Sequence, residues 1–445
     1  PLIVRYITST VVYLPEQDAV KTIGKLALFM VALVAIQCYS NYYISNNGHV
    51  MGAKIEYDMR AEIFAHYQKL SFAFYDNQKV GQLMARITTD LFDISELLHH
   101  GPENITISLI KIIGAFVIMM GISPKLTVAA FALVPFMIAY AYFFNKRMKK
   151  AFRQNRIKIA DINSQIEDNL SGIRVVKSFA NEEVEQEKFS RGNKGFLDAK
   201  KNSYLFMGGY QAGLTAFTTL ITVVVVIAGA LWIPGGSVSI TDLITFLLYI
   251  NVFTEPVKTL IDFTEQFQNG YSGFERFMEI LSIEPDISDE ENAIVMENVR
   301  GEVEFQDVSF RYEEHLSRVL RHINLKVPAG SYVALVGTSG AGKTTLCSLI
   351  PRFYDVSEGR ILIDGCDIRH YKLKSLRDHI GIVQQDVFLF SDSVNFNIAY
   401  GKIKASEQEI EQAAKLAAAD DFISALPEGY ETKVGERGVK LSGGQ

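Results

Sequence analysis

One stretch decides the fold of the second part of this chain: Gly337-Thr338-Ser339-Gly340-Ala341-Gly342-Lys343-Thr344. It matches the phosphate-binding pattern G-x-x-x-x-G-K-[ST] at every fixed position. A short β-rich run, Val333–Val336, comes before it, and a helix is expected after it, over Lys343–Ile350. The glycines let successive N–H groups turn toward phosphate oxygens, and the helix adds the positive end of its dipole. We therefore predict a nucleotide site in which Lys343 reaches the β- and γ-phosphates and Thr344 is a ligand of Mg²⁺.

The sequence around this loop alternates between strand-like and helical patterns. Apolar and polar residues alternate over Glu302–Phe310. Further short β-rich runs are His322–Val327, Tyr332–Val336, Ile361–Ile363 and Ile380–Val383. A helix is expected over Ser406–Ala419, where Ser406 and Glu409 have the spacing of a capping box. Strands that alternate with helices predict an α/β domain over residues 301–445.

The first part of the chain has a different character, because it holds long apolar runs. A helix that spans a bilayer needs about 20 mostly apolar residues. Five runs are candidates for such helices: Gly24–Ile44, Ile105–Ile122, Leu126–Phe144, Leu205–Ile233 and Leu243–Phe253 with its flanks. We interpret Pro1 to about Tyr13 as the tail of a sixth span, truncated at the N-terminal end. Residues 1–283 are thus predicted to be an all-α polytopic transmembrane bundle, and the acidic residues 284–300 a linker. The predicted fold is multidomain, a helical membrane domain followed by an α/β domain.

Composition excludes several classes of protein. Hydrophobic residues make up 48% of the 445 positions and charged residues 21%, which excludes a disordered chain. Three cysteines exclude a disulfide scaffold, and we expect reduced thiols. The net charge of −6 gives no general attraction to nucleic acid, so no nucleic-acid partner is expected. Residues 1–283 carry a net charge of +2 and residues 284–445 a net charge of −8, so the two parts differ in charge too.

Basic residues orient the predicted spans. Seven Lys and Arg residues follow Phe144 within residues 146–158, whereas the short turns at 123–125 and 234–241 carry one between them. Lys and Arg accumulate on the cytoplasmic side of membrane proteins. Helical patterns continue from the spans over Ser45–Leu70 and Asn145–Ser171, which places long helical extensions in the cytoplasm. The breaks at Phe72–Gly81 and Ser171–Ala180 are then tips that contact a cytosolic domain, or simply solvated hairpins.

The last five residues, Leu441-Ser442-Gly443-Gly444-Gln445, add a second motif to the phosphate loop. A phosphate loop followed about 100 residues later by this stretch resembles the ATP-binding cassette (ABC) family. With helical spans fused upstream, the chain is similar to exporter-type half-transporters of the bacterial lipid and multidrug kind. The resemblance implies ATP and Mg²⁺ as cofactors, an adenine stacked on Tyr312, and a γ-phosphate and Mg²⁺ sensor at Gln385. Many relatives carry Pro at the position of Gln384. The ATP-binding residues it implies are Tyr312, Gly337, Thr338, Ser339, Gly340, Ala341, Gly342, Lys343, Thr344, Thr345, Ser442, Gly443, Gly444 and Gln445, with Thr344 and Gln385 at the Mg²⁺.

The resemblance also implies a function. It is ATP-driven export of an amphipathic substrate, a lipid, drug or peptide, across the cytoplasmic membrane. ATP would lie between the cassettes of two half-transporters, identical or different. The alternative is an ATP-gated channel or membrane regulator built on the same parts. The family's Walker B aspartate, catalytic glutamate and switch histidine lie beyond Gln445. We therefore expect these 445 residues alone to bind nucleotide weakly and not to turn it over, because no carboxylate orients the attacking water.

Two further features of the first part lie outside these motifs. Lys111 lies within an apolar run, where a charge usually faces a bundle interior or water. It either lines a substrate cavity or forms a structural pair. His99 and His100 are adjacent, but neighbouring residues on a helix point in different directions, and we expect no Cys or third ligand near them. We therefore predict no metal site at this pair.

Overall fold

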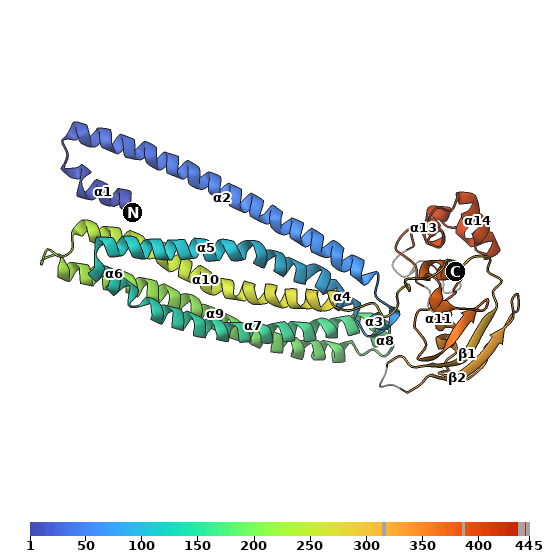
Figure 1. Cartoon of the computed structure of the whole chain (residues 1–445). Coiled ribbons are helices and arrows are strands. Elements are labelled where there is room, and N and C mark those ends of the chain that lie inside the picture. The colour runs from blue at the N-terminus through green and yellow to red at the C-terminus, as the bar shows by residue number, and fades with distance from the viewer. Residues whose placement is uncertain (314–316, 385–387, 435–440, 442–445) are drawn as a thin grey trace. The chain divides into compact units, whose positions relative to one another are not determined.

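The computed structural model describes residues 1–313, 317–384, 388–434 and 441. The chain divides into two compact units, residues 1–70 with 74–285 and residues 71–73 with 286–445. The first, here called the helical unit, consists of helices, and the second, the sheet unit, contains the strands (Figure 1). Each is described by itself.

The helical unit is built from five long helices and several short ones. In chain order its elements are α1 (Leu2–Ser9), η1 (Val11–Tyr13), α2 (Glu16–Tyr67), α3 (Phe72–Asp76), α4 (Val80–Ala85), η2 (Arg86–Asp90), α5 (Leu91–Ile122), α6 (Pro124–Phe131), α7 (Val134–Ser171), α8 (Ile173–Ser178), α9 (Glu182–Trp232) and α10 (Ile240–Leu281). The division between the units falls within α3. Local signals fix several helix starts. Ser123 caps α6 with Pro124 in its first turn, and Ser239 and Asp242 form a capping box at the start of α10.

The predicted spans are confirmed. Among the described residues, five helical stretches are long and apolar enough to cross a membrane. They are Glu16–Tyr67, Val80–Ile122, Pro124–Ser171, Glu182–Trp232 and Ile240–Leu281. Leu2–Tyr13 is a shorter apolar stretch. The long helical extensions are confirmed as well, because α2 continues to Tyr67 and α7 to Ser171.

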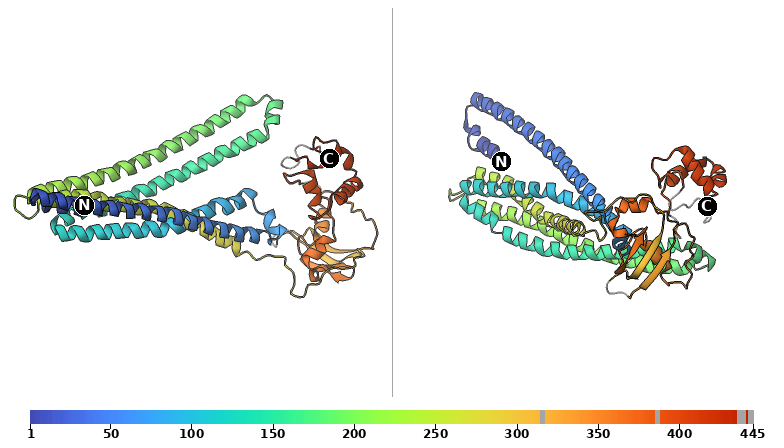
Figure 2. Two further views of the ribbon diagram at one scale, coloured as in Figure 1. Left: turned by 90° about the horizontal axis from the view of Figure 1, so that it is seen from above. Right: turned by 45° about the vertical axis from the view of Figure 1, so that its right-hand side comes forward.

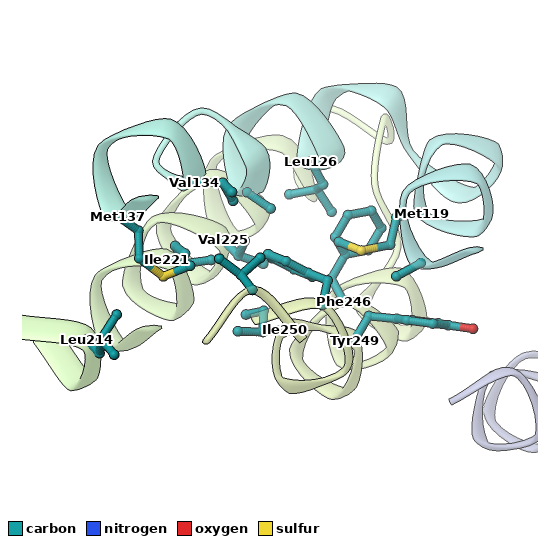
Figure 3. Close-up of a cluster of buried hydrophobic side chains, with 14 of the residues drawn as sticks. Met119, Leu126, Val134, Met137, Leu214, Ile221, Val225, Phe246, Tyr249 and Ile250 are labelled. Carbon is teal, nitrogen blue, oxygen red and sulfur yellow. The ribbon is translucent and has the colours of Figure 1, made fainter. Parts of the chain in front are cut away.

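The core of the helical unit lies where five helices converge. α5 runs beside α10, and α7 runs beside α9. Their buried side chains meet in one apolar cluster together with those of α6, and Phe131 stacks on Phe253 with ring centroids 4.6 Å apart. The residues labelled in Figure 3 show this convergence: Met119, Leu126, Val134, Met137, Leu214, Ile221, Val225, Phe246, Tyr249 and Ile250.

Two parts of the helical unit lie apart from this core. The C-terminal part of α7 and the N-terminal part of α9, drawn in green, run as a pair away from α2, α5 and α10 toward α8 (Figure 2). The helix α2 meets α5 only in its C-terminal half, and the two separate toward the N-terminal end of α2 (Figure 1). Among the described residues, the buried positions of α2 are Gly52, Ile63 and Tyr67.

The described residues of the sheet unit form a four-stranded sheet in the order β2-β1-β3-β4, with antiparallel pairing between its strands. Its elements are β1 (Val303–Phe310), β2 (Leu320–Val327), α11 (Lys343–Leu349), β3 (Glu358–Ile363), β4 (Cys366–Asp367), η3 (Ile368–His370), α12 (Leu373–Asp378), α13 (Val394–Ala399), α14 (Glu407–Leu416), α15 (Asp420–Ser424) and η4 (Gly429–Glu431). Phe305 and Ile361 of the sheet pack with Leu349 of α11 in one core. The strands predicted at Glu302–Phe310, His322–Val327 and Ile361–Ile363 are confirmed.

Two predicted strands of this unit are wrong. Tyr332–Val336 and Ile380–Val383 form no strand in the part of the chain that the structure describes. Both runs are rich in β-branched residues, but a strand forms only beside a partner that takes up its N–H and C=O groups. Neither run pairs with a segment of the described residues, and the side chains of Tyr332, Val336 and Val383 lie almost fully exposed.

Candidate functional site

The phosphate loop has the backbone that its glycines predict. Gly340 has φ of +81° and Gly342 φ of +87°, in the left-handed region that side chains disfavour. At Gly342 a Cβ atom would also lie 2.7 Å from Cδ2 of Leu320, a buried residue of β2. The glycine at this position is therefore required twice, by its dihedral angle and by its neighbour. α11 begins at the next residue, Lys343.

Lys343 lies over the loop itself. Its Nζ donates hydrogen bonds to the carbonyl oxygens of Gly337, at 2.9 Å, and Thr338, at 2.7 Å. An ammonium group has three donors, and these two acceptors are neutral. A phosphate oxygen is a stronger, charge-assisted partner for the same group. Lys343 therefore places a positive charge on the loop, and a bound phosphate can replace the two carbonyl oxygens as its hydrogen-bond partner.

Two threonines follow the lysine and have different surroundings. The Thr344 side chain is exposed, whereas Thr345 is buried and its Oγ1 lies 2.8 Å from Oη of Tyr312. The exposed hydroxyl suits a ligand of Mg²⁺, since this ion prefers oxygen. The buried hydroxyl instead ties the start of α11 to the residues that follow β1.

Tyr312 thereby lies near the phosphate loop, through its contact with Thr345. Its ring packs edge to face with Phe310, at 5.0 Å between centroids, and with Tyr354, at 5.3 Å. The residue is 41% exposed, so part of the ring faces solvent. Stacking of adenine on this ring stays a prediction.

The remaining predicted ATP residues lie outside the described residues. These are Gln385 and the stretch Ser442, Gly443, Gly444 and Gln445. Leu441, just before that stretch, is described. It packs against an apolar cluster formed by Val394, Ala414, Ile423 and Val434.

The structure also gives surroundings to the two unexplained features of the helical unit. Lys111 lines a small cavity of about 120 Å³ together with Asn104, Glu255 and Thr259, which leaves both of its interpretations open. Contrary to the prediction, His99 and His100 have further ligands nearby. His49 and Glu96 lie beside them, and His49 comes from a different helix. The sequence gives a partial signal for this, because Glu96 stands at helical spacing from the pair, whereas His49 lies far from it along the chain.

Comparisons with known proteins agree with this geometry. Residues 1–257 match the family described as the ABC transporter transmembrane region, and residues 320–445 match the family described as ABC transporter. Over its whole length the chain is 43% identical to a Bacillus subtilis protein named uncharacterized ABC transporter ATP-binding protein YwjA, and it covers 77% of that protein. It is 37% identical to the putative multidrug export ATP-binding/permease protein YgaD of the same organism, over 100% of this chain and 77% of YgaD.

A solved structure is similar over nearly the whole chain. It is a bacterial Atm1-family ABC exporter with ATP bound. The TM-score is 0.80 and the sequence identity 29%, and the match covers 99% of this chain and 78% of the other.

Proposed function

The chain belongs to the ABC transporter family, and from this premise we propose that it is an ATP-driven exporter of an amphipathic substrate. It is a multi-pass membrane protein whose cassette lies on the cytoplasmic side. The observation that carries the proposal is the union, in one chain, of five membrane-spanning stretches with a phosphate loop. Two similar proteins also carry export in their names, YgaD and the solved Atm1-family structure. Lipids, drugs and peptides are the substrate classes we propose.

We propose that the phosphate loop binds the nucleotide. The residues present fit ATP and Mg²⁺: Gly340 and Gly342 of the loop are in left-handed conformation, Lys343 bonds two neutral carbonyls within the described part of the chain, and Thr344 is exposed. Lys343 would bind the β- and γ-phosphates, and Thr344 with Gln385 would hold the Mg²⁺. The ion would neutralise charge on the phosphates. Tyr312 would orient the adenine by stacking.

We also propose that the protein works as a dimer of half-transporters. A single chain carries one phosphate loop and one Leu-Ser-Gly-Gly-Gln stretch. Two such anion-binding segments, one from each partner, can approach the same ATP from opposite sides. ATP would then hold two cassettes together, and hydrolysis would release them. The partner is a second copy of this chain or a different half-transporter.

Uptake into inside-out membrane vesicles tests the proposed function. The vesicles come from cells that express the gene, and the probe is a fluorescent amphipathic dye. We expect uptake with Mg²⁺ and ATP, and background uptake with ADP or with the Lys343→Met variant. Uptake of the same size with ADP, or in that variant, would contradict an ATP-driven exporter.

A further inference from the structure

A cluster of three histidines and one glutamate lies between α2 and α5 in the helical unit. Each of His49, Glu96, His99 and His100 offers one ligand atom, and these atoms lie within 4.8 Å of one another. The ring of His49 is 4.8 Å from that of His99 and 5.3 Å from that of His100, between centroids.

The local geometry of two helices produces this cluster. Glu96, His99 and His100 stand at positions i, i+3 and i+4 of α5, which share one face of a helix. His49 comes from α2, and the glycines beside it let the two helices approach. A Cβ atom on Gly52 would lie 2.8 Å from Oγ of Ser95 and 2.9 Å from Nδ1 of His99. A larger residue at Gly52 would therefore displace the cluster.

His99 has the hydrogen bond of a metal ligand. Its Nδ1 lies 2.7 Å from the carbonyl oxygen of Ser95, and because a carbonyl only accepts, Nδ1 carries the proton. Nε2 then holds a lone pair. The His99 side chain is only 3% exposed, and its Nε2 atom has no hydrogen-bond partner among the described residues. It lies 3.8 Å from Oε1 of Glu96, so the lone pair is directed into the cluster.

His100 is arranged in the same way. Its Nδ1 lies 3.4 Å from Oε2 of Glu103, and its Nε2 lies 3.6 Å from Oε2 of Glu96. Histidines that bind metals usually donate their other ring N–H to a carbonyl or carboxylate, which fixes the ring. Both histidines of α5 have such an outer partner, and both direct Nε2 toward Glu96.

We propose that His49, Glu96, His99 and His100 bind a divalent transition metal of the zinc class. Imidazole and carboxylate are ligands that Zn²⁺ takes in tetrahedral sites. Bonds of about 2.0–2.1 Å place such ligands roughly 3.4 Å apart, so the most distant pair, within 4.8 Å, must close by up to about 1.4 Å. His49 can supply this movement because its side chain is exposed. The carboxylates of Glu96 and Glu103 balance the two charges of the ion.

The proposed site lies where α2 and α5 come into contact. Within the described residues, α2 has no buried position before Gly52, so His49 stands where the contact with α5 begins. By sequence it follows the apolar run Gly24–Ile44, and His100 precedes the run Ile105–Ile122. A metal here would link the two helices at the cytoplasmic ends of their spans.

Zinc titration of the purified chain tests the site. The chain is kept in detergent without an affinity tag, and Zn²⁺ binding is measured by competition with a chromophoric chelator. We expect one high-affinity equivalent in the wild type. His49→Ala and Glu96→Gln should each weaken binding 10- to 100-fold, whereas the control His379→Ala, in the sheet unit, should leave it unchanged. Co²⁺ should give the visible absorption of a tetrahedral site in the wild type and lose it in His49→Ala.

His49 is exposed, so His49→Ala should fold even if a variant of buried His99 does not. Equal Zn²⁺ affinity in wild type, His49→Ala and Glu96→Gln would overturn the proposal, because binding would then lie elsewhere. The absence of any high-affinity equivalent in the wild type, or its loss in His379→Ala, would overturn it too.

Discussion

The phosphate loop of the sheet unit and the histidine cluster of the helical unit are assembled in opposite ways. The loop is one continuous stretch, in which backbone angles and side chains come from eight neighbouring residues. The cluster takes one ligand from α2 and three from α5, and it exists only because these helices pack together. A site within one continuous stretch can be recognised in the sequence. A site assembled from two helices can be recognised in full only in the folded structure.

Glycines serve both sites, but for different reasons. Gly340 and Gly342 adopt positive φ, which an L side chain disfavours. Gly52 is helical, and its lack of a side chain lets α2 approach Ser95 and His99. The first role is a property of one residue, and the second is a property of a contact. Substitutions can therefore separate the two kinds of site.

The largest effect is expected from Lys343→Met. This change removes the charge on the phosphate loop while keeping most of the side-chain volume. A hydrogen bond to a charged group contributes about 1.5–3 kcal/mol, so ATP affinity should fall roughly 10- to 150-fold. Equilibrium binding of a fluorescent ATP analogue measures it. Lys374→Met is the control, since Lys374 is an exposed residue of α12 that pairs with Asp378. Equal losses in the two variants would mean that only general charge matters.

Gly342→Ala should lower the stability of the sheet unit. Positive φ costs an alanine about 1–3 kcal/mol, and the new Cβ atom would in addition press on Leu320. Gly365→Ala separates these causes. Gly365 has φ of +83°, but a Cβ atom there would meet no described atom within 4 Å. Calorimetric unfolding should show the larger loss for Gly342→Ala, by roughly 1–3 kcal/mol of overpacking. Equal losses of stability in the two variants would show that the Leu320 side chain moves aside without a measurable cost.

Gly52→Ala should weaken metal binding without removing a ligand. The added methyl group would displace His99, and a Zn²⁺ affinity about tenfold lower corresponds to about 1.4 kcal/mol. Gly48→Ala is the matched control on the same face of α2, because its Cβ atom would lie 4.0 Å from Cδ2 of His99, an ordinary contact. The chelator competition described above measures both. If Gly52→Ala binds Zn²⁺ as the wild type does, the cluster does not depend on close helix packing.

The smallest effect concerns pH and the capping box of α14. Nζ of Lys402 donates a hydrogen bond to Oε1 of Glu409 at 2.5 Å, and the backbone N–H of Ser406 donates to Oε2 of the same carboxylate at 2.8 Å. The hydrogen bond from Lys402, followed by those from Ser406, lowers the pKa of Glu409 to about 2. Because this pKa is depressed, the stabilisation is complete above the ordinary pKa of 4.5 and is lost as the pH falls toward 2.

Glu409→Gln should therefore lower the melting temperature slightly at pH 7, and the difference from wild type should shrink below pH 4.5. Circular dichroism melts at pH 7, 5 and 3 measure it. Glu411→Gln, on the same helix but outside the capping box, is the control. A difference that stays constant down to pH 3 would contradict the role of the carboxylate.

Features that depend on local pattern can be predicted from this sequence, whereas features that depend on partners distant along the chain cannot. The five spans, three strands, α11 and the capping box at Ser406 follow from periodicity and caps, and the structure has them. Tyr332–Val336 and Ile380–Val383 have strand composition, but strand formation requires a pairing partner. The histidine cluster is only partly predictable: Glu96, His99 and His100 have helical spacing in the sequence, but His49 comes from another helix. Tyr312 could be placed beside the loop only through the resemblance.

The most direct test of the exporter is the concentration ratio that it builds up. Inside-out vesicles are loaded and bathed with the same dye concentration, and Mg²⁺ and ATP are added while membrane current is recorded. A pump should raise the internal concentration above the external one at the plateau, without a matching ion current. A plateau that stays at equal concentrations, with an ATP-dependent ion current, would contradict export and indicate an ATP-gated channel instead.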